Sequence, residues 1–205
     1  MRKIFTILCL LAAAALPAVV AAQSQTSLYA TLLSALKAGK TGIDYTLLRL
    51  SYMDSPARKA AKDTSGPEKA MFEALNKKDY PAALKEAETV LDSEYVNIDA
   101  HYVALVANRE MGATEKAEFH RTVFRGLIDS ILHSGDGKSM EKAWVVISVH
   151  EEYVVLRALG FRPGEQSLMH KDNHSYDVMK VKNAEDGTEQ TFYFNVDIPF
   201  AHYGF

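Results

Sequence analysis

Hydrophobic positions along the chain follow two different periods, and the change comes near residue 134. Before it, apolar residues recur every three or four positions, as in helices with one buried face. After it, short β-branched and aromatic runs alternate with turn residues, as in strands. The pattern predicts a helical part over residues 23–133, followed by a part that mixes strands with a helix over residues 134–205.

One segment of the helical part fits two structures. Leu48, Leu50 and Tyr52 alternate with polar residues, which is typical of a strand, but Asp44 is suited to cap a short helix. Helix is the favoured interpretation. The stretch 57–66 is charged and rich in small residues, so we expect a surface loop there. The other predicted helices cover residues 24–38, 67–78, 79–91, 97–111 and 114–133.

The segment 79–91 resembles the second helix of a tetratricopeptide repeat, with a tyrosine at the turn and alanines at close contacts. That repeat has a period of 34 residues, and the same step takes Ala83 to Ala117 and Lys78 to Gly112. Four ordinary amphipathic helices with chance spacing explain the sequence equally well. Both interpretations predict antiparallel helices joined by short turns.

Two helical hairpins cannot bury their apolar faces unaided, because about three repeats are needed for a stable stack. We therefore expect residues 134–205 to lie against the helices and to share one core with them. In the helix over 67–78, Ala70, Phe72 and Leu75 are expected to be buried. The predicted fold is α+β: N-terminal antiparallel helical hairpins packed against a small, mainly antiparallel sheet with one short helix.

The C-terminal part is predicted to start with a turn and the run Ala143–Val149. This run is rich in β-branched residues, so we expect a strand buried on both faces, although a helix from Ser139 is the alternative. A short helix over Glu151–Leu159 should follow, with Tyr153, Leu156 and Leu159 facing inward.

Turn and strand residues alternate after Gly160, which should end this helix. Phe192, Phe194 and Val196 recur every second residue and should face the core. The aromatic tail from Phe200 should pack rather than extend into solvent. The expected turns are 162–164 and 171–175, and the expected strands are 166–170, 176–181 and 190–196, the last two joined as a hairpin.

Residues 1–22 have the features of a secretory signal peptide: a positively charged start, an apolar run over 4–16 and small residues up to Ala22. The run is shorter than the roughly 20 residues of a membrane span. Cleavage near Ala22 would remove Cys9, the only cysteine, which excludes disulfides and thiol chemistry in the mature chain. We expect an exported protein, periplasmic or secreted.

The charge of the chain narrows the class of partner. The formal charge is −3, and loss of Arg2 and Lys3 with the leader would make it −5. A mildly acidic protein is a poor partner for nucleic acid or anionic lipid. A protein or peptide partner is the class that remains, and the sequence does not define an oligomeric state.

Known catalytic and cofactor motifs are incomplete in this sequence. A phosphate loop ending at Gly137-Lys138-Ser139 would need glycine where Leu132 stands. A zinc-protease helix starting at His150 would need a second histidine where Val154 stands. There is no Gly-x-Ser-x-Gly nucleophile motif either. We therefore expect no cofactor, no metal and no identified catalytic residue.

Titratable residues gather near the junction of the two parts. A candidate binding site there contains Asp136, His150, Glu151, Glu152 and Tyr153. The acids have an equally simple structural explanation, since carboxylates favour the start of a helix.

Two functions fit these residues. The favoured one is a non-catalytic periplasmic interaction module, and the alternative is a hydrolase that uses Asp136, His150 and Glu151. A metal carrier that uses His170 and His174 is a weaker third interpretation, because their surroundings have a turn composition.

Several phrases of the sequence together resemble one family. They are Ser134–Ser139, Ile147–Tyr153, Gln166–Leu168, Tyr176-Asp177 and Tyr193–Val196. With these phrases the chain is similar to an exported bacterial family of unknown function, domain-of-unknown-function family 4919. The resemblance covers most of the mature chain and implies an exported, single-unit protein, with no activity to transfer.

Overall fold

The structure, a computed structural model, describes residues 18–203, with side chains from residue 28 to residue 202. Most of the predicted leader lies outside these residues, and helix α1 (Ala18–Lys37) runs across the expected cleavage point near Ala22. Within residues 18–203, no helix is both long and apolar enough to cross a membrane.

The N-terminal part is helical, as predicted. Helix α2 (Tyr45–Met53) resolves the ambiguous segment, because the Asp44 side chain accepts a hydrogen bond from the backbone N–H of Leu47. The predicted loop over 57–66 is wrong at its start, where helix α3 (Pro56–Ala60) forms. Ser55 caps α3, and its proline occupies the first turn, where the missing N–H costs nothing.

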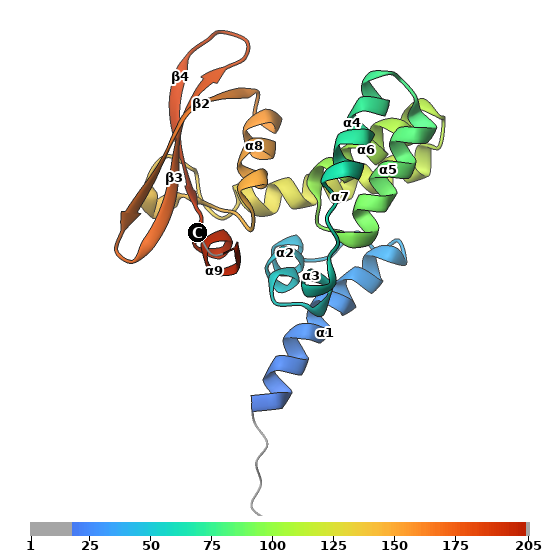
Figure 1. Cartoon of the computed structure of the whole chain (residues 1–205), viewed down its shortest axis with the longest axis horizontal. Coiled ribbons are helices and arrows are strands. Elements are labelled where there is room, and N and C mark those ends of the chain that lie inside the picture. The colour runs from blue at the N-terminus through green and yellow to red at the C-terminus, as the bar shows by residue number, and fades with distance from the viewer. Residues whose placement is uncertain (1–17, 204–205) are drawn as a thin grey trace, which may run out of the picture.

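Two helical hairpins follow and stand beside each other (Figure 1). Their inner turns share one geometry at a spacing of 34 residues. Lys78 and Gly112 both have positive φ, at 60° and 77°. The next residue in each turn donates its N–H to the carbonyl five residues earlier. The four helices are α4 (Ser65–Asn76), α5 (Tyr80–Ser93), α6 (Ile98–Glu110) and α7 (Thr114–Leu132).

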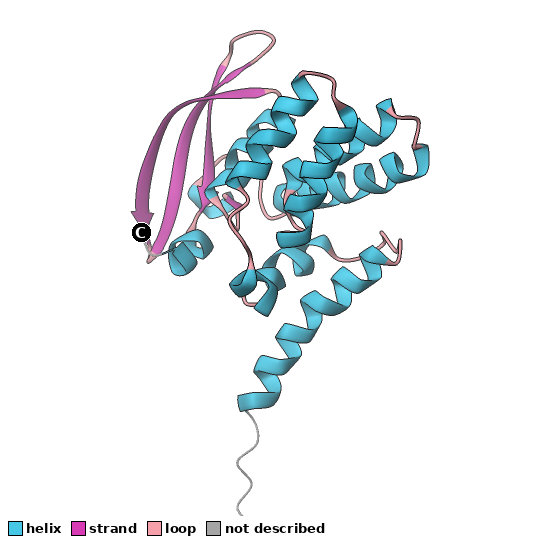
Figure 2. Cartoon of the chain, turned by 45° about the vertical axis from the view of Figure 1, so that its right-hand side comes forward, coloured by secondary structure: helices cyan, strands magenta, loops and turns pink. Residues whose placement is uncertain are grey.

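A four-stranded sheet forms the other side of the molecule, and Figure 2 shows helices packed along one of its faces. Its strand order is β1-β4-β3-β2, with β1 parallel to β4 and the other pairs antiparallel. Phe192, Phe194 and Val196 are buried, which confirms their predicted face. The strands are β1 (Trp144–Val145), β2 (Phe161–Lys171), β3 (His174–Asn183) and β4 (Glu189–Asn195).

The strand predicted over Ala143–Val149 is mostly wrong. Only Trp144 and Val145 pair with β4, because a 3₁₀ turn (Met140–Lys142) precedes them and a helix starts soon after. That helix, α8 (Val149–Ala158), begins four residues downstream of β1, and Ser148 caps it. Val146 and Ile147 are buried as expected, but in a bend rather than a strand, and Val145 and Val149 are only partly buried.

One other local prediction is corrected, and the prediction for the tail is confirmed at Phe200. The turn expected over 162–164 lies inside β2, where a bulge between Pro163 and Gln166 accommodates the proline and the glycine. The tail forms helix α9 (Asp197–Tyr203), and Phe200 packs against the core as expected.

The inward face predicted for α8 is also wrong in part. Leu156 is buried, but Tyr153 and Leu159 are 36% and 37% exposed, whereas Val154 and Val155 are buried. The reason is that α8 is contacted from two sides, by the helices and by the sheet (Figure 1). A single amphipathic stripe does not describe a helix in that position.

One buried hydrophobic cluster contains residues from both parts of the chain. It includes Leu36 of α1, Leu127 of α7, Leu156 of α8 and Phe194 of β4. A second, smaller cluster fills the space among α4, α5 and α6. The α+β class is therefore confirmed, and the division into domains at residue 133 stays a prediction.

Candidate functional site

Helix α8 holds most of the predicted site residues and lies between the helical part and the sheet (Figure 1). The Ser148 hydroxyl accepts a hydrogen bond from the backbone N–H of Glu151, which starts the helix. The negative charge of Glu151, in the first turn, favours this helix end electrostatically. The contacts of the site residues diverge: His150 and Glu151 contact the helical part, whereas Glu152 and Tyr153 lie beside the sheet.

Glu151 forms a buried ion pair with Arg49 of α2. The Arg49 Nε lies 2.9 Å from Glu151 Oε1, and its Nη2 lies 2.5 Å from Oε2. Arg49 also donates to the Ser130 hydroxyl on α7 and to the Val145 carbonyl in β1. Glu151 Oε2 accepts a further bond from the backbone N–H of Ile147. Four elements are thus joined by one satisfied network, which is a structural role.

His150 belongs to a second charged group, which is half exposed. Its Nε2 lies 3.0 Å from Oδ2 of Asp99, in the first turn of α6, and Arg157 Nη2 donates to Asp99 Oδ1 at 2.5 Å. The hydrogen bond to Asp99 raises the pKa of His150. Burial alone would raise the pKa of Asp99, but the hydrogen bonds and charges of His150 and Arg157 outweigh it and lower that pKa.

A cavity of about 210 Å³ opens beside this group. Thr64 and Asn97 both donate hydrogen bonds to the Glu68 carboxylate that borders it. The pKa of Glu94 is raised to about 7, first by burial and then by the charges of Glu68 and Glu151. Residues that line this acidic cavity are Glu68, Glu94, Val96, Asn97, Ile98, Ser148, His150, Glu151 and Val154.

A second cavity, of about 360 Å³, lies on the other side of Asp99 and Val154. Its walls are largely apolar and include the rings of Tyr102 and Phe124, whose centroids lie 5.8 Å apart with the ring planes tilted by 47°. Phe72 and Leu75, predicted to be buried, instead lie partly exposed along it. The lining residues are Phe72, Leu75, Asn76, Asp99, Tyr102, Phe124, Val154, Arg157 and Ala158.

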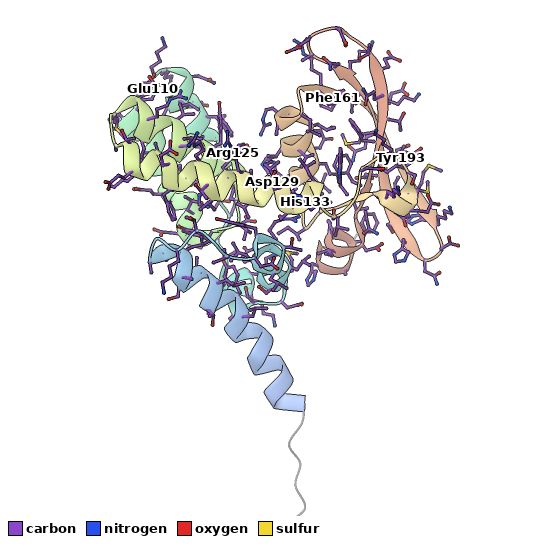
Figure 3. The ribbon with its side chains drawn as sticks, turned by 180° about the vertical axis from the view of Figure 1, so that it is seen from behind. Glu110, Arg125, Asp129, His133, Phe161 and Tyr193 are labelled. Atoms are coloured by element: carbon purple, nitrogen blue, oxygen red, sulfur yellow. The ribbon has the colours of Figure 1, made fainter. Side chains whose placement is uncertain are left out.

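We call the two cavities together the α8 cleft. α8 forms one wall, and α4 and α6 form the opposite wall. Figure 3 shows α7, marked by Arg125, Asp129 and His133, running from the helical hairpins toward the sheet. α7 therefore bridges the two parts of the chain whose surfaces meet in the cleft.

A larger cavity, of about 580 Å³, lies at one end of β2, β3 and β4 and is lined by no residue of α8. Its lysines, Lys180 and Lys182, are already paired with Glu165 and Glu189, and all four side chains are exposed. Exposed ion pairs of this kind contribute little to stability and do not fix their side chains in one position. For this reason the smaller α8 cleft, with its partly buried charges, is the better candidate site.

Glu152 faces the sheet and is fully buried. Among the described residues, its carboxyl oxygens have no hydrogen-bond partner besides the neighbouring carboxylate of Asp177. Burial, followed by the neighbouring Asp177 carboxylate, raises the pKa of Glu152 to about 9. The neutral acid can donate a hydrogen bond to Asp177, which also accepts a hydrogen bond from Gln166 at 2.6 Å. Tyr153 donates to the same glutamine at 2.7 Å. Glu152 and Tyr153 thus fasten α8 to the sheet and do not line the cleft.

Asp136, the remaining predicted residue, is not brought to His150. Its carboxylate accepts a hydrogen bond from the backbone N–H of Lys138 and lies 3.8 Å from the Lys142 amine, in the turn before β1. The cleft instead contains Asp99, Arg157 and Glu94, which sequence reasoning missed. In the part of the chain that the structure describes, no group of three or more His, Cys, Asp or Glu side chains could hold a metal ion.

Comparison with known proteins identifies the family of this chain but no activity. No curated protein and no solved structure matches the chain. The sequence profile of the family described as a domain of unknown function, DUF4919, matches residues 18–203. That range includes every helix and strand that the structure describes. The chain therefore belongs to the DUF4919 family.

Proposed function

We propose that this protein is an exported, non-catalytic interaction module of the periplasm, and that the α8 cleft is its binding surface. The observation that carries this proposal is the cleft itself, where an acidic cavity and an apolar cavity meet at Val154. Binding sites typically combine apolar walls with a few convergent polar groups, as this cleft does.

The helical part supports the same proposal. Its two hairpins repeat with the 34-residue step of tetratricopeptide proteins, and equivalent turns have equivalent backbone hydrogen bonds. Repeats of that kind present helix faces to protein or peptide partners. Here α8 closes the open side of the hairpins, so that the partner surface is a short cleft rather than a long groove.

A pull-down from the cell envelope with the purified protein tests the proposal. We expect specific partners that are retained by the Leu168→Ala variant and lost with Tyr102→Ala. Both side chains are similarly exposed, at 45% and 40%, but only Tyr102 lines the cleft. Failure to recover any specific partner under several buffer conditions would count against an interaction module.

A hydrolase remains the second candidate because His150 is held by a carboxylate, as the base of a catalytic triad is. Ser148 lines the same cavity, but its hydroxyl already caps α8. Asp136, part of the predicted hydrolase site, contacts other residues. Hydrolysis of an ester or peptide substrate by the wild-type protein, abolished in His150→Ala, would establish this alternative.

A further inference from the structure

The acidic cavity holds carboxylates whose negative charge is only partly offset by neighbouring groups. Glu68 and Glu94 both line it, and Glu151 adds a third carboxylate, which Arg49 neutralises. Burial and the nearby carboxylates raise the pKa of Glu94 to about 7, although the charges of Arg58 on α3 and His150 on α8 act to lower it. A positively charged group that entered this cavity would therefore be stabilised by Glu68 and Glu94.

The kind of cation follows from the geometry. Among the described residues, no three acidic or histidine side chains are arranged to hold a metal ion. An ammonium or guanidinium group needs only hydrogen-bond acceptors within reach, which Glu68 and Glu94 supply. The cavity, at about 210 Å³, has room for the end of a lysine or arginine side chain.

The adjoining apolar cavity suggests what carries the cation. Phe72, Tyr102 and Phe124 form a surface that suits a bulky apolar side chain, and Val154 connects this surface to the acidic cavity. A free amine would leave the apolar cavity unused. A polypeptide fills both cavities when a basic residue and an apolar residue lie close together in its sequence.

We propose that the α8 cleft recognises a polypeptide segment with a lysine or arginine close to a bulky aliphatic or aromatic residue. This proposal rests on the proposed function. The basic side chain lies between Glu68 and Glu94. The apolar side chain packs against Tyr102 and Phe72. The Asp99–His150–Arg157 group separates the two subsites.

A library of acetylated and amidated pentapeptides tests this proposal. The central residue is fixed as lysine, acetyl-lysine or glutamate, and the flanking positions vary. We expect the purified protein to retain lysine peptides with Leu, Phe or Tyr beside the centre, and to bind them about tenfold more tightly than the acetyl-lysine forms. Equal retention of the three sets, retention of none, or equally tight binding of 1,5-diaminopentane would overturn the proposal.

Matched variants locate the binding. Glu94→Gln should abolish the preference for lysine over acetyl-lysine, whereas Glu88→Gln, an exposed acid of α5 outside the cleft, should keep it. Tyr102→Ala should keep the preference for lysine and lose the preference for apolar neighbours. Circular dichroism of each variant checks that it folds. If Glu94→Gln has no effect in folded protein, the cation subsite is wrong.

The envelope pull-down separates this proposal from the proposed function. A partner that is lost with Tyr102→Ala but captured equally by the wild-type protein and by Glu94→Gln would leave the α8 cleft as the binding surface and overturn the proposed basic ligand. Recovery of no partner at all, together with no peptide retention, would overturn both. Capture that requires Glu94 and Tyr102, with the lysine preference above, would support both.

Discussion

The buried acid Glu152 makes stability depend on pH in a way that one substitution should remove. In the folded protein its pKa is raised to about 9 from the usual 4.5, first by burial and then by Asp177. The folded state therefore keeps a proton that the unfolded chain releases. This contribution to stability is complete below about pH 4.5 and is lost as the pH rises through about 9.

The slope between these limits is at most about 1.4 kcal/mol of unfolding free energy per pH unit. From pH 7 to pH 8.5, ionisation should therefore cost the wild-type protein up to about 2 kcal/mol. Glu152→Gln cannot ionise, and its amide can still donate a hydrogen bond to Asp177. We expect the variant to be about as stable as wild type at pH 5 and more stable at pH 8.5.

Urea unfolding at pH 5, 7, 8 and 8.5, at constant ionic strength, measures the difference. Other groups that titrate in this range, such as Glu94 and His150, are present in both proteins and cancel in the comparison. Glu185→Gln, in the exposed β3–β4 turn, should behave like wild type. If the unfolding free energies of wild type and Glu152→Gln fall by the same amount from pH 7 to pH 8.5, Glu152 is not protonated in the folded protein.

Three other predictions concern the core, the cleft and the leader. Arg49→Ala should destabilise the fold by about 3–5 kcal/mol, since it leaves Glu151 buried without its partner. Adding Glu151→Leu should recover much of that loss, as measured by urea unfolding. If the double variant recovers no stability, the broken ion pair is not the cause of the loss. The affinity for a lysine-centred peptide should fall by up to about tenfold when the pH is lowered from 7 to 6, because Glu94 takes up a proton. If calorimetry gives the same affinity at both pH values, Glu94 does not bind the lysine. N-terminal sequencing of protein from the periplasm should start at Gln23, and an intact Met1 would contradict cleavage.

Much of the helical part follows from local sequence, whereas the strand near α8 does not. The spacing of apolar residues and the cap at Asp44 are local signals, and the helices they predict are present. The run Val145–Val149 has strand composition, but the Ser148 cap competes within the same few residues and starts α8. Tertiary contacts decided that competition, since β1 pairs only where β4 is available.

The sequence predicts only those residues of the candidate site that lie close together along the chain. His150 and Glu151 stand out as neighbours in the sequence and do border the cleft. Their partners Asp99 and Arg49 are 51 and 102 residues away, and no local pattern joins residues at such distances. Asp136 was included because it is near α8 in the sequence, yet the turn before β1 directs it to Lys142.

Amide hydrogen exchange tests most directly whether the α8 cleft is a binding site. The measurement compares the protein alone with the protein saturated by the tightest lysine-centred peptide. We predict slower exchange in α4, in residues 94–102 and in α8, which form the cleft walls. Slower exchange confined to the exposed edge strand β2, or no change anywhere, would contradict the account.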